Sequence, residues 1–389
     1  MKNSGINQTM FKEMFLLRPD MVFLNHGSFG ACPRPVFEEY QRWQLEMERQ
    51  PVEFLARRYD TLLYEARAVL GNYLNASPED LVYISNATTG INIVARSLKF
   101  ESGDEILGTD HEYGAIDRTW RFICHRTGAR YINQPIALPV TSSAEFVEHF
   151  WKGVTPRTKI ISLSHITSAT ALIFPVVAIC RRAREAGILT IIDGAHAPGQ
   201  IPVDLQQIGA DFYSGNCHKW LCAPKGAAFL YARPEVQHLV EPLVVSWGWQ
   251  NPEAGAHTFV DWLEWQGTRD YAAFLSVSAA IAFQEEHNWA KVREGCHALL
   301  TDYRQRINQL TGLEPICPDS QEWYAQMATI RMPECDVAQL QKRLWETYRI
   351  EIPHILWNDQ PFFRISVQAY NTPEDIEAFM EALKQELHL

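Results

Sequence analysis

Short apolar runs alternate with amphipathic stretches through the middle of this chain. Six runs have the composition of buried strands, at 81–85, 105–107, 159–164, 188–192, 211–214 and 226–231. Stretches between them have helical periodicity, at 90–99, 113–128, 144–153 and 177–187. A strand–helix alternation of this kind predicts an α/β fold, with a mostly parallel mixed sheet that helices cover on both faces.

The pattern differs at the two ends of the chain. Residues 36–70 predict helical structure, and near Gln266–Tyr271 the strand–helix alternation stops. Beyond that point we expect a helical stretch at 270–310. Candidate strands follow at 325–331, 349–354 and 361–366, with a helix at 336–347 between the first two. The last helix begins at Thr372-Pro373, with Asp375 at the capping-box position.

The length of 389 residues exceeds one ordinary hydrophobic core and predicts two domains. We expect an N-terminal segment at 1–22, a large domain at 23–268 and a smaller α+β domain at 269–389. Part of 1–35 is a candidate addition to the smaller domain.

Composition narrows the function classes. The chain is 47% hydrophobic and 21% charged, as in globular proteins, and its net charge of −11 disfavours nucleic acid as a partner. Residues 1–14 carry no apolar core of signal-peptide length, and the longest apolar run, 169–180, is too short to span a bilayer. These features favour a cytoplasmic protein with no membrane partner. The eight cysteines form no C-x-x-C pair, so we expect no metal.

Two predicted strand ends carry the strongest chemical signal. Asp193 ends an apolar strand, where a carboxylate is costly without a cationic partner. Lys219 follows the next strand among apolar and aromatic neighbours, where desolvation favours its free amine. Ligands of open α/β sheets sit at such strand ends. An aspartate facing a pyridinium nitrogen and a lysine that forms a Schiff base are what a protein contributes to pyridoxal phosphate chemistry.

Three motifs give the chain a family resemblance. They are Phe23 to Gly30 (FLNHGSFG), Gly215 to Gly226 (GNCHKWLCAPKG), and Arg364-Ile365-Ser366 with Tyr370-Asn371. On these residues the chain resembles the class V aminotransferase family of pyridoxal phosphate enzymes, which have the fold of aspartate aminotransferase. It is most similar to the isopenicillin N epimerase branch. The resemblance runs from about Phe23 to the C-terminus.

The resemblance implies roles around the cofactor ring. Lys219 would form the Schiff base and later move the Cα proton, and Asp193 would pair with the pyridinium nitrogen. His196 would lie near the phenolic oxygen. Tyr113 stands where many relatives have a ring-stacking histidine, and an aromatic residue there can still stack. Ser168 stands where cysteine desulfurases of the family have an asparagine that contacts the phenolic oxygen, so this departure leaves that contact open.

Other residues are candidates for the phosphate and the substrate. Ala87-Thr88 open a predicted helix after a strand, and backbone N–H groups at such a terminus suit a phosphate dianion. By resemblance, Asn216 and His218 add phosphate contacts, and Gly267-Thr268 reach the neighbouring active site of a homodimer. Also by resemblance, Arg364 would bind the substrate α-carboxylate. Asn25 and His26 either form a turn or line the substrate pocket.

Several simpler interpretations stand beside these. Lys225 is a second lysine in the same motif, although Lys219 is favoured because it follows His218. Asp193 alone would suit a helix cap, and Tyr113 could equally be core packing. Cys217 and Cys222 flank Lys219, but their spacing and the lack of further ligands favour packing over a metal site.

The resemblance does not choose between reactions. Epimerisation or racemisation of an amino acid at Cα comes first, through an external aldimine and a quinonoid. It needs proton transfer on both faces, for which Tyr113 is a candidate second acid. β-Elimination from a cysteine conjugate or sulfoxide is the alternative. Cysteine desulfuration is weaker, because relatives carry its cysteine shortly before the carboxylate-binding arginine and 348–364 holds none.

Two alternative functions lie outside this chemistry. A non-catalytic binding protein has no need of Lys219, Asp193 and Arg364 together. A nicotinamide oxidoreductase fits the strand–helix pattern, but no G-x-G-x-x-G follows the first strand.

Overall fold

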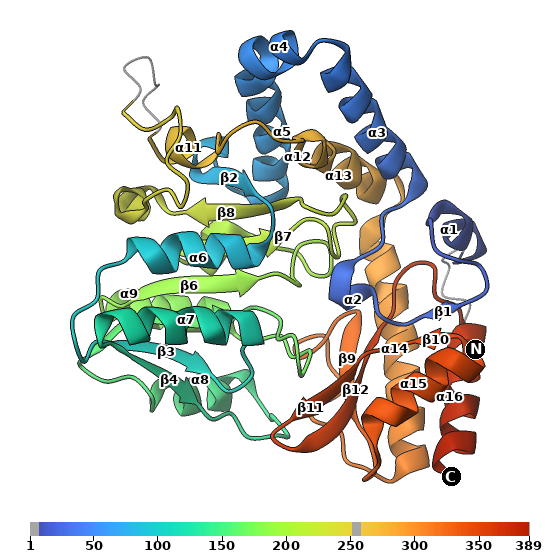
Figure 1. Ribbon diagram of the computed structural model, residues 1–389. Coiled ribbons are helices and arrows are strands. Elements are labelled where there is room, and N and C mark those ends of the chain that lie inside the picture. Colours follow the sequence, from blue (N-terminus) through green and yellow to red (C-terminus); the bar gives the residue numbers. More distant parts are fainter. Residues whose placement is uncertain (1–7, 251–257, 389) are drawn as a thin grey trace.

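The computed structural model describes residues 8–250 and 258–388 of the chain. Residues 1–7 of the expected N-terminal segment therefore lie outside the described residues. A seven-stranded sheet and a three-stranded sheet form the framework, and helices surround both (Figure 1).

The large sheet confirms the predicted α/β class. Its strand order is β2-β8-β7-β6-β5-β3-β4, and every strand is parallel to its neighbours except β8, which is antiparallel to both. The strands are β2 (Leu81–Ile84), β3 (Glu105–Thr109), β4 (Arg130–Gln134), β5 (Thr158–Ser164), β6 (Leu189–Gly194), β7 (Phe212–Asn216) and β8 (Ala228–Ala232). The six predicted strands are all present.

Strand β4 is the one that the pattern of apolar runs missed. It lies at the edge of the sheet, and its residues are half-buried or exposed. An edge strand has one neighbour and little covering, so its sequence carries no apolar run.

Helices cover both faces of the large sheet. Helices α6 (Ala87–Ser97) and α7 (Gly114–Thr127) lie side by side on one face, where Ile91, Val94 and Trp120 are fully buried (Figure 1). The other helices of this part are α5 (Tyr59–Leu74), α8 (Ser143–Trp151), α9 (Val176–Glu185), α10 (Leu205–Ile208) and α11 (Thr258–Leu263).

The predicted helical stretch at 36–70 is interrupted. Helix α3 (Arg34–Arg49) ends at Gln50, and the short α4 (Pro51–Glu53) and a π-helical turn (Phe54–Arg58) lead into α5. Pro51 has no N–H to continue α3, and its ring clashes with the preceding turn. Proline therefore explains the break.

The C-terminal part contains the second sheet. Strands β9 (Met327–Arg331), β11 (His354–Trp357) and β12 (Gln360–Ser366) form it in the antiparallel order β11-β12-β9. Its helices are α12 (Ala272–Leu275), α13 (Val277–Glu286), α14 (Trp289–Thr311), α15 (Val337–Tyr348) and α16 (Pro373–Leu387). Thr372 and Asp375 form the predicted capping box of α16.

The predicted strand at 349–354 is divided between two sheets. Strand β10 (Ile350–Glu351) pairs with β1 (Val22–Phe23), whereas His354 begins β11. The N-terminal chain, with α1 (Gln8–Met14) and α2 (His26–Phe29), thereby joins the C-terminal part.

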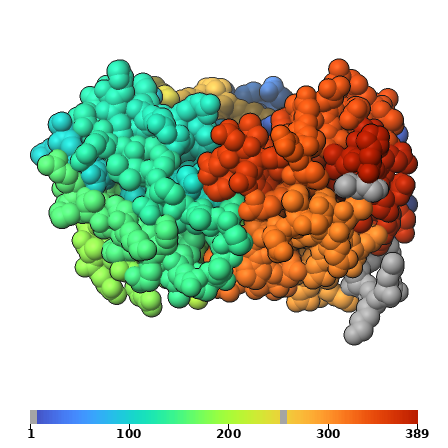
Figure 2. All heavy atoms as spheres, turned by 90° about the horizontal axis from the view of Figure 1, so that it is seen from below, coloured from blue at the N-terminus to red at the C-terminus, as the bar shows by residue number. Residues whose placement is uncertain are grey.

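The two parts meet along one boundary. Seen from below, the green surface of the large-sheet part lies against the orange and red surface of the C-terminal part (Figure 2). The division at residue 268 remains our proposal.

Among the described residues, no helix combines the length and the apolar character that crossing a membrane requires.

Candidate active site

The carboxyl ends of neighbouring strands converge beside the N-terminus of α6. Asp193 on β6 pairs in register with Ser164 on β5 and with Ser214 on β7. A Cβ on Gly90 would lie 2.2 Å from the Ser214 hydroxyl, so glycine lets α6 approach β7 closely. The strand ends and the helix terminus therefore face one space.

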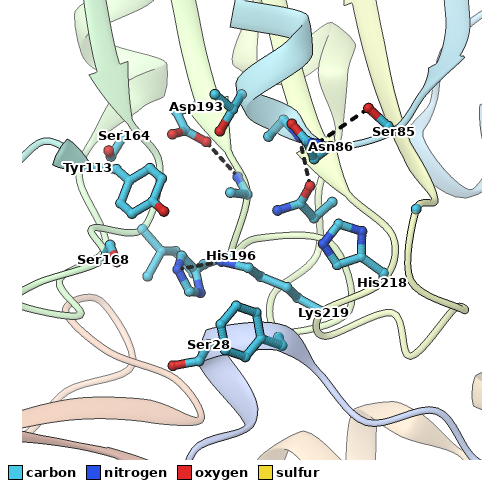
Figure 3. Close-up of a pocket in the computed structure, with 17 residues that line it drawn as sticks. Ser28, Ser85, Asn86, Tyr113, Ser164, Ser168, Asp193, His196, His218 and Lys219 are labelled. Atoms are coloured by element: carbon cyan, nitrogen blue, oxygen red, sulfur yellow. Dashed lines mark hydrogen bonds between the residues drawn. The ribbon is translucent and has the colours of Figure 1, made fainter. Parts of the chain in front are cut away.

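That space is a cavity of about 580 Å³ (Figure 3). Its walls combine strand ends, the start of α6 and the N-terminal segment around α2. The lining residues are Ser28, Phe29, Ser85, Asn86, Ala87, Thr88, Tyr113, Ser164, Ile166, Ser168, Asp193, Ala195, His196, Asn216, His218, Lys219 and Gly226.

Lys219 points into the cavity and is poised as a free amine. Its Nζ lies 3.1 Å from Nε2 of His196 (Figure 3). Burial, followed by the positive charge of Arg364, lowers the pKa of Lys219 to about 7. The rival Lys225 donates to the carbonyl of Gly30 and is not in the cavity wall.

Asp193 is a buried carboxylate with a place for a cation. Its Oδ1 accepts the N–H of Ala195 at 2.9 Å. Burial raises the pKa of Asp193, and the positive charge of Lys219 opposes this rise. A further cation in the cavity, such as a pyridinium nitrogen, would stabilise the charged carboxylate.

The start of α6 forms a corner of the cavity that is suited to an anion. Asn86 caps the helix by accepting the N–H of Thr89, and Oδ1 of Asn216 accepts the N–H of Ala87 at 2.8 Å. His218 Nδ1 lies 2.9 Å from the carbonyl of Ala227, which leaves Nε2 for a ligand. The positive end of the α6 dipole and the hydroxyls of Ser85 and Thr88 suit a phosphate dianion at this end of the cavity.

Sequence reasoning missed two members of this corner. Ser85 and Asn86 both line the cavity, and the Ser85 hydroxyl lies 3.1 Å from that of Thr89. The signal was an asparagine directly before Ala-Thr-Thr-Gly, which is a preferred N-cap residue.

Arg364 lies directly behind the cavity wall. Its NH1 donates to the carbonyl of Ser168 at 2.6 Å, and its NH2 donates to the hydroxyl of Ser28 at 3.0 Å. Its Nε is buried and has no hydrogen-bond partner in the described part of the chain, where no carboxylate pairs with the guanidinium either. Burial lowers the pKa of Arg364 to about 10.

A buried, uncompensated cation of this kind suits an incoming anion. Ser28 and Ser168 line the cavity while they hold Arg364. The family resemblance left open a contact of Ser168 with the phenolic oxygen, and in this structure its hydroxyl lies 3.2 Å from NH1 of Arg364.

Tyr113 lines the cavity at the start of α7, with 47% of its surface exposed. The preceding Glu112 was not anticipated from the sequence. Its carboxylate accepts the N–H of Ser164 at 2.8 Å, the hydroxyl of Ser164 at 2.6 Å and the hydroxyl of Thr109 at 2.7 Å. These bonds hold the loop that carries Tyr113 against β5. Burial raises the pKa of Glu112 to about 7.

Besides Arg364, three candidates from the sequence lie outside the cavity wall. Asn25 donates to Glu351, and His26 lies 3.0 Å from both the hydroxyl of Tyr370 and the carbonyl of Lys219. Both side chains are buried behind the residues they support. Thr268 is exposed on the surface of the chain.

Among the described residues, the cavity wall holds neither a cysteine nor a cluster of metal ligands. None of the described lining residues is a cysteine, and all eight cysteines are free thiols. Within residues 8–250 and 258–388, no group of three or more His, Cys, Asp or Glu side chains is placed to hold a metal ion.

Solved structures share the fold over nearly the whole chain. The apo structure of a cysteine desulfurase from Thermococcus onnurineus has a TM-score of 0.83 at 18% identity, covering 100% of both chains. The complex of a cystine C–S lyase with its product, cysteine persulfide, has a TM-score of 0.80 at 23% identity, covering 94% of this chain and 97% of that one. The fold is that of the pyridoxal-phosphate-dependent transferases.

Sequence comparison extends this result to the family. The model of class V aminotransferases matches residues 32–379. An isopenicillin N epimerase from Amycolatopsis lactamdurans is 36% identical over 96% of this chain and 97% of its own length. A probable chloroplastic L-cysteine desulfhydrase from Arabidopsis thaliana is 31% identical over 94% of this chain and 82% of its own length. The chain therefore belongs to the class V aminotransferase family, and pyridoxal 5'-phosphate is its cofactor.

Proposed function

We propose that this enzyme epimerises or racemises an amino acid at Cα. One observation carries the proposal: Lys219 and Tyr113 enter the same cavity from different walls, as proton transfer on two faces of a substrate requires (Figure 3). The similarity to isopenicillin N epimerases over nearly the full length of the chain supports it.

Each proposed role follows from the position of a side chain. Bound pyridoxal phosphate supplies an electron sink that acidifies the Cα–H bond. Asp193 keeps the pyridine nitrogen protonated, and the corner formed by Thr88, Asn216 and His218 holds the phosphate. Arg364 orients the substrate through its α-carboxylate.

Proton transfer falls to two residues. Lys219, whose free amine is favoured by burial, removes the Cα proton from one face. Tyr113 returns a proton from the other face. Glu112 positions Tyr113 by fixing the preceding loop to β5.

A second candidate is β-elimination from a cysteine derivative. The similarity to an L-cysteine desulfhydrase at 31% identity favours it. Elimination needs proton transfer on one face only, so Lys219 alone would suffice. Desulfuration has less support, because no described cysteine lines the cavity.

Proton NMR in D₂O separates these reactions. The holoenzyme is incubated with a panel of amino acids and cysteine conjugates. Loss of the α-proton signal from an intact carbon skeleton supports epimerisation or racemisation. Release of pyruvate and a thiol or sulfenate supports β-elimination and contradicts our first proposal.

Replacing Tyr113 by phenylalanine tests the second acid. Tyr113→Phe keeps the ring but removes the hydroxyl, so we expect epimerisation to fall by about 10²-fold. Exchange of the α-proton with solvent deuterium should continue, because Lys219 remains in place. Exchange is measured by NMR and inversion by chiral chromatography. Full epimerase activity in Tyr113→Phe would exclude this role.

We also propose that the enzyme is a homodimer with Gly267-Thr268 in the neighbouring active site. The exposed position of Thr268, away from the cavity of its own chain, supports this. Light scattering should give the mass of two chains. Thr268→Ala should weaken cofactor binding several-fold, because a phosphate hydrogen bond is lost. A monomer with full cofactor affinity contradicts the proposal.

A further inference from the structure

Trp220 follows Lys219 in the sequence. Its side chain contacts His196, whose imidazole also lies beside the amine of Lys219. The indole Nε1 of Trp220 donates to Nδ1 of His196 at 3.3 Å. On the opposite side of the same imidazole, Nε2 lies 3.1 Å from Nζ of Lys219. Trp220 and His196 are both buried, so water does not compete for these bonds.

These contacts determine where the histidine carries its proton. An indole nitrogen can only donate a hydrogen bond, so Nδ1 of His196 must be the acceptor. Burial, and then the positive charges of Lys219 and Arg364, hold the pKa of His196 well below its ordinary value, so the ring is neutral. A neutral imidazole that accepts at Nδ1 carries its single proton on Nε2.

We propose that Trp220 is a positioning residue that locks His196 in its Nε2-protonated tautomer. The ring then presents a hydrogen-bond donor to the amine of Lys219 and to the phenolic oxygen of the cofactor. The part that concerns the cofactor rests on the function proposed above. The part that concerns the tautomer depends only on the protein.

The indole is itself held firmly. Gln284 donates to the backbone carbonyl of Trp220 at 2.9 Å, and the ring of His26 lies 4.8 Å from that of Trp220. A Cβ on Gly199, whose φ is +87°, would lie 2.2 Å from the same carbonyl, so a glycine is required beside the Trp220 backbone. The N–H of the indole therefore keeps its direction.

The charges around His196 favour the same neutral state. Lys219, Arg364 and His26 each disfavour a second proton on the ring. Asp193 is the carboxylate in the described cavity wall, and its charge is directed to the cofactor nitrogen in our proposal. His196 should therefore stay neutral, and its Nε2–H can donate to Lys219 when the lysine amine is itself neutral.

The tautomer can be read directly by NMR. In wild-type protein carrying ¹⁵N-labelled histidine and tryptophan, the His196 signals are assigned by their loss in His196→Gln. We expect Nε2 to have the shift of a protonated nitrogen, and Nδ1 to show a coupling to Nε1 of Trp220 across the hydrogen bond. A protonated Nδ1 overturns the proposal. This measurement needs no cofactor and no Trp220 variant that folds.

The consequence for the cofactor is tested with Trp220→Phe. A donor at the phenolic oxygen stabilises its negative charge and lowers the proton affinity of the nitrogen that joins Lys219 to the cofactor. Without the indole, both tautomers of His196 become accessible. We expect the pH titration of the visible absorbance of the holoenzyme to shift upwards by about one pH unit.

Trp120→Phe is the matched control. Trp120 is also fully buried, and its Nε1 donates to the hydroxyl of Ser162 at 2.7 Å, outside the cavity wall. This variant should keep the wild-type tautomer and titration. If Trp220→Phe behaves like Trp120→Phe in both measurements, Trp220 has only a packing role. If the protein stays colourless with pyridoxal phosphate, the proposed function fails while the tautomer result still stands.

Discussion

Lys219→Ala is expected to lose covalent attachment of the cofactor and to lower turnover by about 10³-fold or more, since in our proposal the residue supplies both the amine and the base. After borohydride reduction, mass spectrometry should find the cofactor fixed to wild-type protein and absent from the variant. Lys225→Ala is the matched control. Its lysine is close in sequence but donates to the carbonyl of Gly30, so the cofactor should stay attached. Attachment in Lys219→Ala would contradict the assignment.

The same lysine sets a pH dependence in the wild-type apoenzyme. Burial and Arg364 lower the pKa of Lys219 to about 7, so its free amine predominates above that pH. The rate of cofactor attachment should therefore rise up to about pH 7 and then level off. An ordinary lysine would give a rate that rises through about pH 10. Stopped-flow absorbance from pH 5.5 to 10 distinguishes the two curves.

Arg364→Met is expected to lower kcat/KM by about 10²-fold or more, because our proposal gives Arg364 a charge-assisted bond to the substrate carboxylate. Most of the change should appear in KM, since the carboxylate is held equally before and during proton transfer. Steady-state kinetics on the substrate identified by NMR provides the measurement.

The stability of the same variant carries independent information. Arg364 is buried without a carboxylate partner among the described residues, so its removal relieves an unfavourable charge. The melting temperature of the Arg364→Met apoenzyme should equal or exceed that of wild type. Arg331→Met, on the neighbouring strand β9, is the control and should retain kcat/KM. A loss below threefold in Arg364→Met would mean that another group binds the carboxylate.

The central sheet could be predicted because its strands are buried on both faces. Most residues of β5 and β6 are buried, and each strand carries a short apolar run that the sequence shows. Strand β4, at the edge of the sheet, lacks that covering and left no apolar run. The break in the helical stretch at 36–70 was visible only as Pro51.

The site residues likewise fall into those that the sequence reveals and those that it does not. Asp193 and Lys219 could be found because they lie at or shortly after the ends of neighbouring strands, and parallel strands bring their carboxyl ends to one edge. Asn216 and His218 came from the family resemblance. Ser28 could not be given a role, because its bond to Arg364 joins residues 336 positions apart in the sequence. Glu112 and Trp220 also depend on contacts between separate elements, with Ser164 and His196.

The sequence by itself therefore determined the fold class, the family and the residues at strand ends, because local apolar patterns and short motifs encode them. Tertiary structure alone decided which polar groups meet. Docking of β12 against the loop after β5 leaves Arg364 behind Ser28 and Ser168 with a buried, unpaired Nε. Packing of the indole of Trp220 on His196 selects one of two tautomers. Such partners are set by how elements pack in space, and no spacing along the chain records that.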